Sequence, residues 1–141
     1  MMLNGVSWLR TGVILGLFSL VGCGGGAGDD LPTAKVKGTV TAGGKPVTEG
    51  EITFSPVKAG KNAGGTVWPD GSFTLTTYVK DDGAIIGQHK VTYTPAMIAV
   101  EANASGHTPT PVSPYSGMVP KEAEITISGG DNQVSIELIK K

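Results

Sequence analysis

Apolar and polar residues alternate in short runs along residues 34–141, the pattern of strands with one buried and one exposed face. Such runs occur at residues 34–42, 51–55, 65–68, 72–77, 88–95, 123–128 and 134–138. The inward positions of three of them are Val36, Gly38 and Val40; Ile52 and Phe54; and His89, Val91 and Tyr93. No apolar period of 3.6 residues follows the first 22 residues, so we predict an all-β fold, an antiparallel β-sandwich of about seven strands.

Turn residues separate these runs. Gly43-Gly44 and the glycines at 129–130 predict tight turns, and Asp70-Gly71 lies between two alternating runs, which is the strongest hairpin signal in the chain. Residues 78–87 are predicted to form a loop. Residues 96–119 are rich in Pro, Thr and Ser toward their middle and are predicted to form a long irregular connection.

The first 22 residues have a different character. Arg10 precedes an apolar run at residues 13–21, which has the length of a signal peptide, whereas a membrane-spanning helix needs about 20 apolar residues. Leu20, Gly22 and Cys23 resemble the lipobox of bacterial lipoproteins. The alternatives are an ordinary secretory signal with an incidental cysteine, or a short uncleaved anchor.

The lipobox resemblance implies signal cleavage between Gly22 and Cys23 and lipidation of the Cys23 thiol through a thioether. Two or three acyl chains, such as palmitate, would then anchor the chain firmly, since each buried CH2 contributes about 0.8 kcal/mol. The expected localisation is extracytoplasmic and membrane-anchored in the cell envelope, with the inner or outer membrane left open.

A glycine-rich stretch follows the cysteine. Residues 24–32 read GGGAGDDLP and predict a flexible stalk. Asp29 and Asp30 are adjacent, but a calcium loop needs further carboxylates at alternating positions, which favours a solvated linker. The chain therefore divides into a signal peptide with a helical core (1–22), a stalk (23–33) and the β-sandwich domain (34–141).

Composition excludes several classes of partner and chemistry. One cysteine cannot form an internal disulfide, and a net charge of −1 with no basic run predicts no nucleic-acid partner. His89 and His107 lie in no metal-binding motif, and His89 has the parity of a partly buried or edge histidine. Ser105 stands near His107 in sequence without a nucleophile-elbow pattern. We predict no cofactor, no metal site and no catalytic residue.

Two aromatic residues are candidate ligand contacts. Trp68 stands at the end of a predicted hairpin strand, and Tyr115 lies in the 96–119 connection. Together they would form a stacking platform for a sugar or peptide. The favoured interpretation is that Trp68 covers one end of the sandwich core, because so large an aromatic contributes heavily to burial. An exposed strand edge that pairs with a partner's strand is a further open route to binding.

A second resemblance covers most of residues 34–140. The segments VKGTV (36–40), GKPV (44–47), DGSF (70–73) and GQHKV (87–91) occur in this order, with Pro114-Tyr115 before the final hairpin. They are similar to the motifs of bacterial carboxypeptidase regulatory-like domains, including small lipoproteins that hold one such domain. The resemblance implies a seven-stranded prealbumin-like sandwich, related in architecture to immunoglobulin domains, and a domain that is non-catalytic where it accompanies peptidases.

Three functions remain open from the sequence. The first is a non-catalytic, lipid-anchored module of the envelope with a structural or interaction role, whose protein or glycan partner is unknown. The second is a carbohydrate- or small-ligand-binding lipoprotein that uses Trp68 and the 96–119 connection. The third is an unrecognised enzyme, which would need titratable groups that converge in a pocket.

Overall fold

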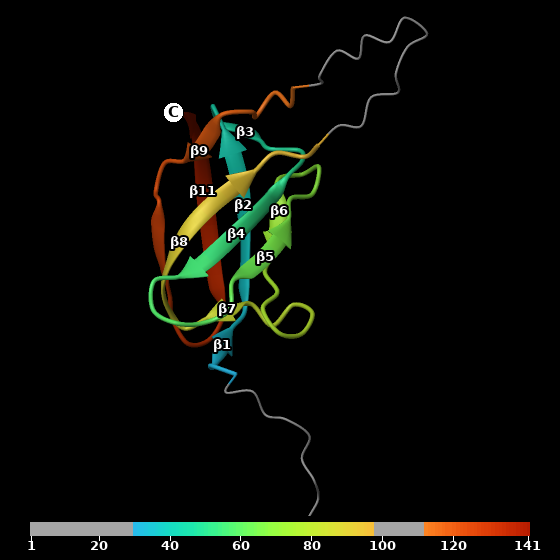
Figure 1. The fold of residues 1–141 in the computed structure, drawn as a ribbon. Helices are drawn as coiled ribbons and strands as arrows, with labels where there is room; N and C mark the ends of the chain where they lie inside the picture. Colours follow the sequence, from blue (N-terminus) through green and yellow to red (C-terminus); the bar gives the residue numbers. More distant parts are fainter. Residues whose placement is uncertain (1–29, 98–111) are drawn as a thin grey trace, which may run out of the picture.

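Two β-sheets packed face to face form the part of the chain that the computed structural model describes, residues 30–97 and 112–141 (Figure 1). The predicted signal peptide, Cys23, most of the stalk, and Ser105 and His107 lie outside these residues. All regular elements of the described ranges are strands, which confirms the predicted all-β sandwich. No helix long and apolar enough to cross a membrane occurs within the described ranges.

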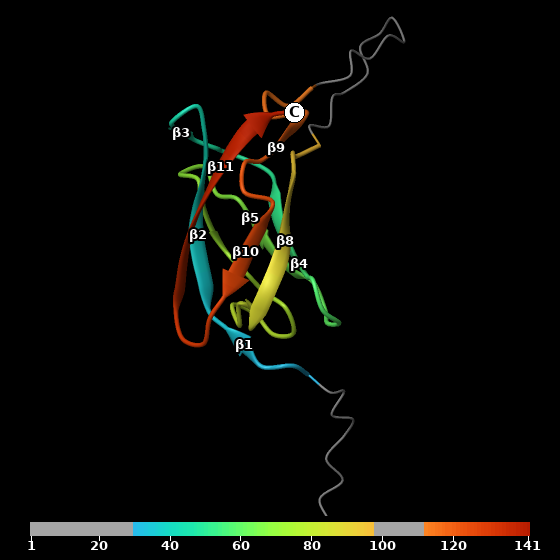
Figure 2. The same cartoon turned by 90° about the vertical axis from the view of Figure 1, so that its left-hand side faces the viewer.

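The strands are β1 (Thr33–Ala34), β2 (Val36–Ala42), β3 (Lys45–Pro46), β4 (Glu51–Pro56), β5 (Ala63–Thr66), β6 (Ser72–Thr74), β7 (Ala84–Ile85), β8 (Gly87–Thr94), β9 (Met118–Pro120), β10 (Glu124–Ile127) and β11 (Asn132–Lys140). One sheet has the order β3-β2-β11-β9, with β6 also paired to β2, and the other has the order β10-β8-β4-β5. β1 and β7 form a small separate pair at one end. Figure 2 shows β2 and β11 in one layer and β4 and β8 in the other.

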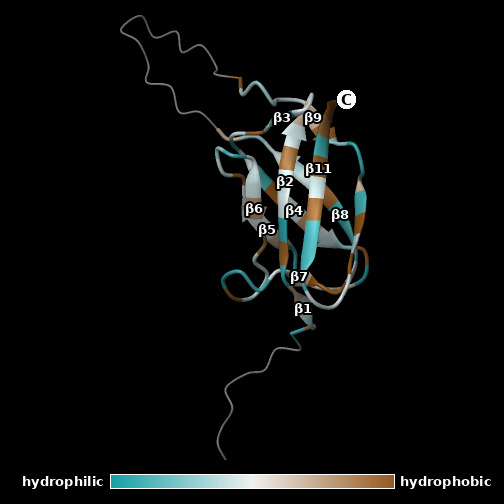
Figure 3. Ribbon diagram, turned by 180° about the vertical axis from the view of Figure 1, so that it is seen from behind, coloured by the Kyte–Doolittle hydropathy of each residue, from teal (hydrophilic) through white to brown (hydrophobic). Residues whose placement is uncertain are grey.

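The core lies between the layers and follows the alternation of the sequence. Every residue predicted to face inward in β2, β4 and β8 is buried. Figure 3 shows hydrophobic and hydrophilic residues alternating along β2 and β11. Phe54 and Phe73 meet across the layers with their ring centroids 6.5 Å apart. Gly38 permits this packing, because a Cβ there would lie 2.6 Å from the Phe73 ring and 2.3 Å from the Val134 carbonyl oxygen.

Two predictions from the sequence, that all strands are antiparallel and that residues 78–87 form a loop, need correction. β2 and β11 are parallel rather than antiparallel, in register from Val36 opposite Asn132 to Ala42 opposite Leu138. Parallel neighbouring strands need a long crossover connection. The chain between β2 and β11 contains all four strands of the second sheet, β4, β5, β8 and β10. Residues 78–87 also contain β7, whose pairing with β1 is too short to leave a periodic signal in the sequence. The fold thus begins at Thr33, inside the segment predicted as stalk.

The predicted hairpin at Asp70-Gly71 forms at its turn but not along its strands. The Gly71 N–H donates to the Trp68 carbonyl at 2.7 Å, and the Trp68 N–H donates to the Ser72 carbonyl at 2.9 Å. Beyond this turn the strands separate, because β5 pairs with β4 in one sheet and β6 pairs with β2 in the other. A single bridge between Gly64 and Thr76 keeps them in contact. The turn therefore joins the two layers at one edge of the sandwich.

Asp82 closes the loop that leads to β7. Its carboxylate accepts backbone hydrogen bonds from Thr77 at 2.6 Å, Tyr78 at 2.9 Å and Val79 at 3.2 Å. Burial raises the pKa of the Asp82 carboxyl, but the three N–H donors outweigh it and hold the pKa below its ordinary value of 3.8. The charged carboxylate therefore stabilises the folded loop.

We expect Asp82→Asn to lower the free energy of unfolding by about 1–3 kcal/mol at neutral pH, since charged hydrogen bonds are lost. A pKa that is lower in the folded state gives stability that is present above the unfolded value and is lost as the pH falls through the folded value. The difference between the two proteins should therefore shrink below about pH 4. Urea unfolding across this pH range measures it. Asp81→Asn is the matched control, and an equal effect there would contradict the assignment to Asp82.

Candidate functional site

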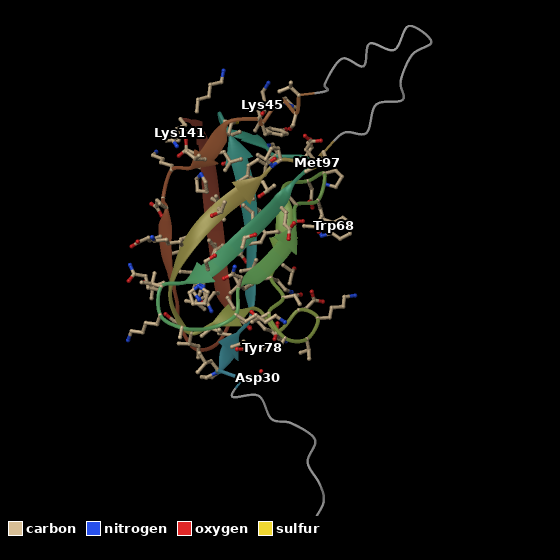
Figure 4. The ribbon with its side chains drawn as sticks, viewed as in Figure 1. Asp30, Lys45, Trp68, Tyr78, Met97 and Lys141 are labelled. Atoms are coloured by element: carbon tan, nitrogen blue, oxygen red, sulfur yellow. The ribbon has the colours of Figure 1, made fainter. Side chains whose placement is uncertain are left out.

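Trp68 projects from the flank of the sandwich into solvent (Figure 4). Its side chain is 60% exposed, so the prediction that it covers the end of the core is wrong. Val67 is the buried residue instead, because the alternation along β5 continues through the next two positions. The turn that follows Trp68 is held by its own side chains. The Asp70 carboxylate accepts hydrogen bonds from the side chain and the backbone of Ser72, which lower the pKa of Asp70.

A shallow hollow of about 610 Å³ lies beside Trp68, where β5 and β6 separate into their two sheets. Its lining includes Gly64 and Gly65, and a Cβ on Gly65 would stand 2.5 Å from the Thr74 carbonyl oxygen, so β5 and the Thr74 backbone approach closely here. The polar residues around it are Glu51, Thr66, Thr74, Thr76, Lys80 and Asp81. Hydroxyl, carboxylate and ammonium groups therefore surround the hollow.

Asp81 has an unusual backbone conformation at the rim of this hollow, which we name the Trp68 groove. Its φ of 61° lies in the left-handed region, where it is alone among the non-glycine residues of the described ranges. The Asp81 N–H donates to the Thr76 hydroxyl at 3.0 Å, which holds the loop against the segment that follows β6. Residues in such conformations cluster at binding and active sites, where the surrounding structure holds them.

The Trp68 groove combines an aromatic face with hydrogen-bonding groups of both kinds. Threonine hydroxyls donate and accept, carboxylates accept, and the lysine ammonium donates. A hydroxylated ring with one apolar face fits such a site, because that face packs on the indole and its hydroxyls reach the polar rim. The geometry thus suits a saccharide or a similar polyhydroxylated ligand.

Tyr115 does not line the Trp68 groove, so the structure does not bring the two predicted ligand contacts together. Its ring packs edge-on against Tyr93 at 6.4 Å between centroids, and its hydroxyl lies 3.4 Å from that of Thr48. The Tyr93 hydroxyl donates to the Glu49 carbonyl at 2.9 Å. Burial, followed by the negative charge of Glu49, raises the pKa of Tyr93 to about 12. Tyr115 therefore contributes to packing around a buried phenol.

His89 is fully buried rather than at an edge. Its Nε2 donates to the Ile85 carbonyl at 2.6 Å, and its ring centroid lies 5.9 Å from that of Phe54. Its Nδ1 has no hydrogen-bond partner among the described residues. Within residues 30–97 and 112–141, no three His, Cys, Asp or Glu side chains gather as metal ligands would. In the described ranges His89 is thus a core residue, and the other predicted site residues, Gly22 and Cys23, lie outside those ranges.

A second hollow, of about 570 Å³, was not predicted from the sequence. It lies at the end of the sandwich where the described chain begins, and its walls are mostly apolar. Leu31, Pro32, Pro56, Val57, Ile85 and Ile86 are among the residues that line it. The run Ala84-Ile85-Ile86 could have indicated an apolar surface here. Three consecutive apolar residues in an extended segment cannot all face the same core, so at least one must lie outside it.

The strands and their pairing define the described part of the chain as an all-β sandwich domain. No protein-family model and no curated protein matches the chain. Among solved structures it is similar to the crystal structure of a DUF3823 family protein from Parabacteroides merdae ATCC 43184, with a TM-score of 0.43 and 16% identity. The match covers 79% of this chain and 48% of the other, so this chain spans about half the length of that protein.

Proposed function

We propose that this chain is a lipid-anchored β-sandwich of the bacterial cell envelope that acts by binding and not by catalysis. The observation that carries the proposal is the lipobox-like stretch Leu20–Cys23, followed by a glycine run and, ten residues after Cys23, by the first strand at Thr33. Since β1 lies at one end of the sandwich, an anchor on Cys23 would hold the whole domain from that end (Figure 1).

The proposed relationship to carboxypeptidase regulatory-like domains is supported by the positions of the matching glycines. Gly44, Gly71 and Gly87 have φ values of 78°, 84° and 132°, so three of the four motifs contain a glycine whose backbone conformation disfavours other residues. The non-catalytic role is supported by the burial of His89 away from the Trp68 groove. The groove itself is open and polar, as suits binding.

Intact-mass analysis of the membrane-extracted protein tests the anchor. We expect loss of residues 1–22 and an added diacylglyceryl group on Cys23, and we expect Cys23→Ser to lose the lipid and membrane retention. Gly24→Ser is the matched control, because it alters the next residue and leaves the thiol intact. Unacylated protein in the soluble fraction, or membrane retention of Cys23→Ser equal to that of the control, would contradict the proposal.

A saccharide is the ligand that the Trp68 groove favours, which makes carbohydrate binding the second candidate function. The specific observation is the 60% exposed indole beside a polar hollow. The chain has two tryptophans, Trp8 and Trp68, so cleavage after residue 22 leaves Trp68 as the sole indole fluorophore. Titration with cell-envelope oligosaccharides should then give a saturable change in its emission, and an unchanged spectrum across such a panel would count against the saccharide.

A further inference from the structure

Four large hydrophobic side chains are exposed at the end of the sandwich where the described chain begins. They are Leu31, Val57, Val79 and Ile86, and their exposed fractions run from 39% to 67%. Figure 1 places β1 and β7 at this end, and Figure 4 shows Asp30 and Tyr78 there. We call these four side chains the basal face. Exposed aliphatic residues scattered singly need no explanation, but a group at one end indicates an interaction surface.

Backbone contacts hold the basal face together. The Ile86 N–H donates to the Pro32 carbonyl at 3.0 Å, and the Val57 N–H donates to the Gln88 carbonyl at 2.9 Å. The Leu31 N–H donates to the Tyr78 hydroxyl at 3.2 Å, which ties the loop bearing Val79 to the start of the described chain. The four side chains are therefore fixed on one framework, and three of them surround the apolar hollow of about 570 Å³.

The short connection between Cys23 and the basal face limits how far this face can lie from the membrane. Seven residues lie between Cys23 and Leu31, and the first three of them are the consecutive glycines Gly24, Gly25 and Gly26. A flexible chain of that length spans roughly 16 Å on average and at most about 28 Å when extended. An acylated Cys23 would therefore keep the basal face close to the bilayer at all times, at a high effective concentration.

We propose that the basal face docks on the lipid surface of the membrane that holds Cys23. This inference rests on the proposed lipid anchor. Lys58 and Lys61 carry positive charge near this face and Asp30 carries negative charge, and so small an excess of charge leaves the apolar side chains as the main attraction to the lipid. Aliphatic side chains enter the boundary between headgroups and acyl chains. The docked domain would leave Trp68 on its flank, accessible to ligands (Figure 4).

Site-specific fluorescence on the full-length lipidated chain in phosphatidylcholine vesicles tests the docking. The thioether blocks Cys23, so a cysteine introduced by Val57→Cys can be labelled alone with an environment-sensitive dye. Ile139→Cys is the matched control, since Ile139 is similarly exposed at 41% and lies in β11 near the opposite end. We expect a blue shift and quenching by brominated lipid at position 57 but not at position 139. A charge introduced by Ile86→Asp should reverse the shift at position 57.

The outcomes separate this inference from the anchor. If intact mass shows no diacylglyceryl group on Cys23, the proposed function fails and the docking fails with it. If the lipid is present and the dye at position 57 reports water, only the docking is overturned. A blue shift without quenching by brominated lipid would mean that the basal face packs on protein, such as a second copy, and would also overturn the inference.

Discussion

Gly83→Ala should destabilise the domain by more than about 3 kcal/mol, because strain and a backbone clash act together at this position. Gly83 has a φ of 88°, which disfavours a Cβ by itself. The added Cβ would also lie 1.8 Å from the Ala34 carbonyl oxygen and 2.7 Å from the Lys35 Cα. Both contacts are with backbone, so no side-chain rotation relieves them, and β1 must separate from β7.

Gly87→Ala provides the matched control for this substitution. Gly87 also has a positive φ, 132°, but a Cβ there would meet no atom within 4 Å. We expect it to cost only the conformational strain, about 1–2 kcal/mol. Urea unfolding followed by circular dichroism compares the two variants. An equal loss of unfolding free energy in the two variants would show that the contact between residue 83 and β1 contributes nothing. That result would contradict the pairing of β1 with β7.

Trp68→Ala should weaken the proposed saccharide binding by about 2 kcal/mol or more, roughly 30-fold, because the indole would supply the main apolar contact in the groove. Trp68→Phe keeps an aromatic face and should retain part of the affinity. Since most of the indole is in solvent, the free energy of unfolding should change by no more than about 0.5 kcal/mol. Calorimetric titration measures binding here, because Trp68→Ala removes the fluorophore.

Thr74→Val is a second variant in the Trp68 groove, and Ile139→Ala is the control outside it. Thr74 lies at the rim of the Trp68 groove, so loss of its hydroxyl should weaken binding, whereas Ile139 is exposed in β11 outside the groove and its truncation should not. Unchanged affinity in Trp68→Ala would remove the groove as the binding site. A parallel loss of affinity and stability would mean that Trp68 supports the fold rather than the ligand.

The candidate site was only partly predictable. Trp68 stood out as a large aromatic beside a turn, but its assignment to the core was wrong, although the alternation of Val67 and Trp68 already places them on opposite faces. The polar partners in the groove come from β4, β5, β6 and the following loop. Nothing local in the sequence brings Glu51 near Lys80, since their proximity depends on how the strands pair.

Elements with a local signal could be predicted from the amino-acid pattern alone. The period of two placed Val36, Ile52 and Val91 in the core, and Asp70-Gly71 produced its turn even though its strands separate. The choice of neighbouring strands could not be predicted in this way. β2 lies parallel to β11, β5 and β6 enter different sheets, and β1 pairs with β7. The reason is physical: alternation states which side of a strand is buried, whereas the choice of neighbour depends on the packing of segments that are far apart in the chain.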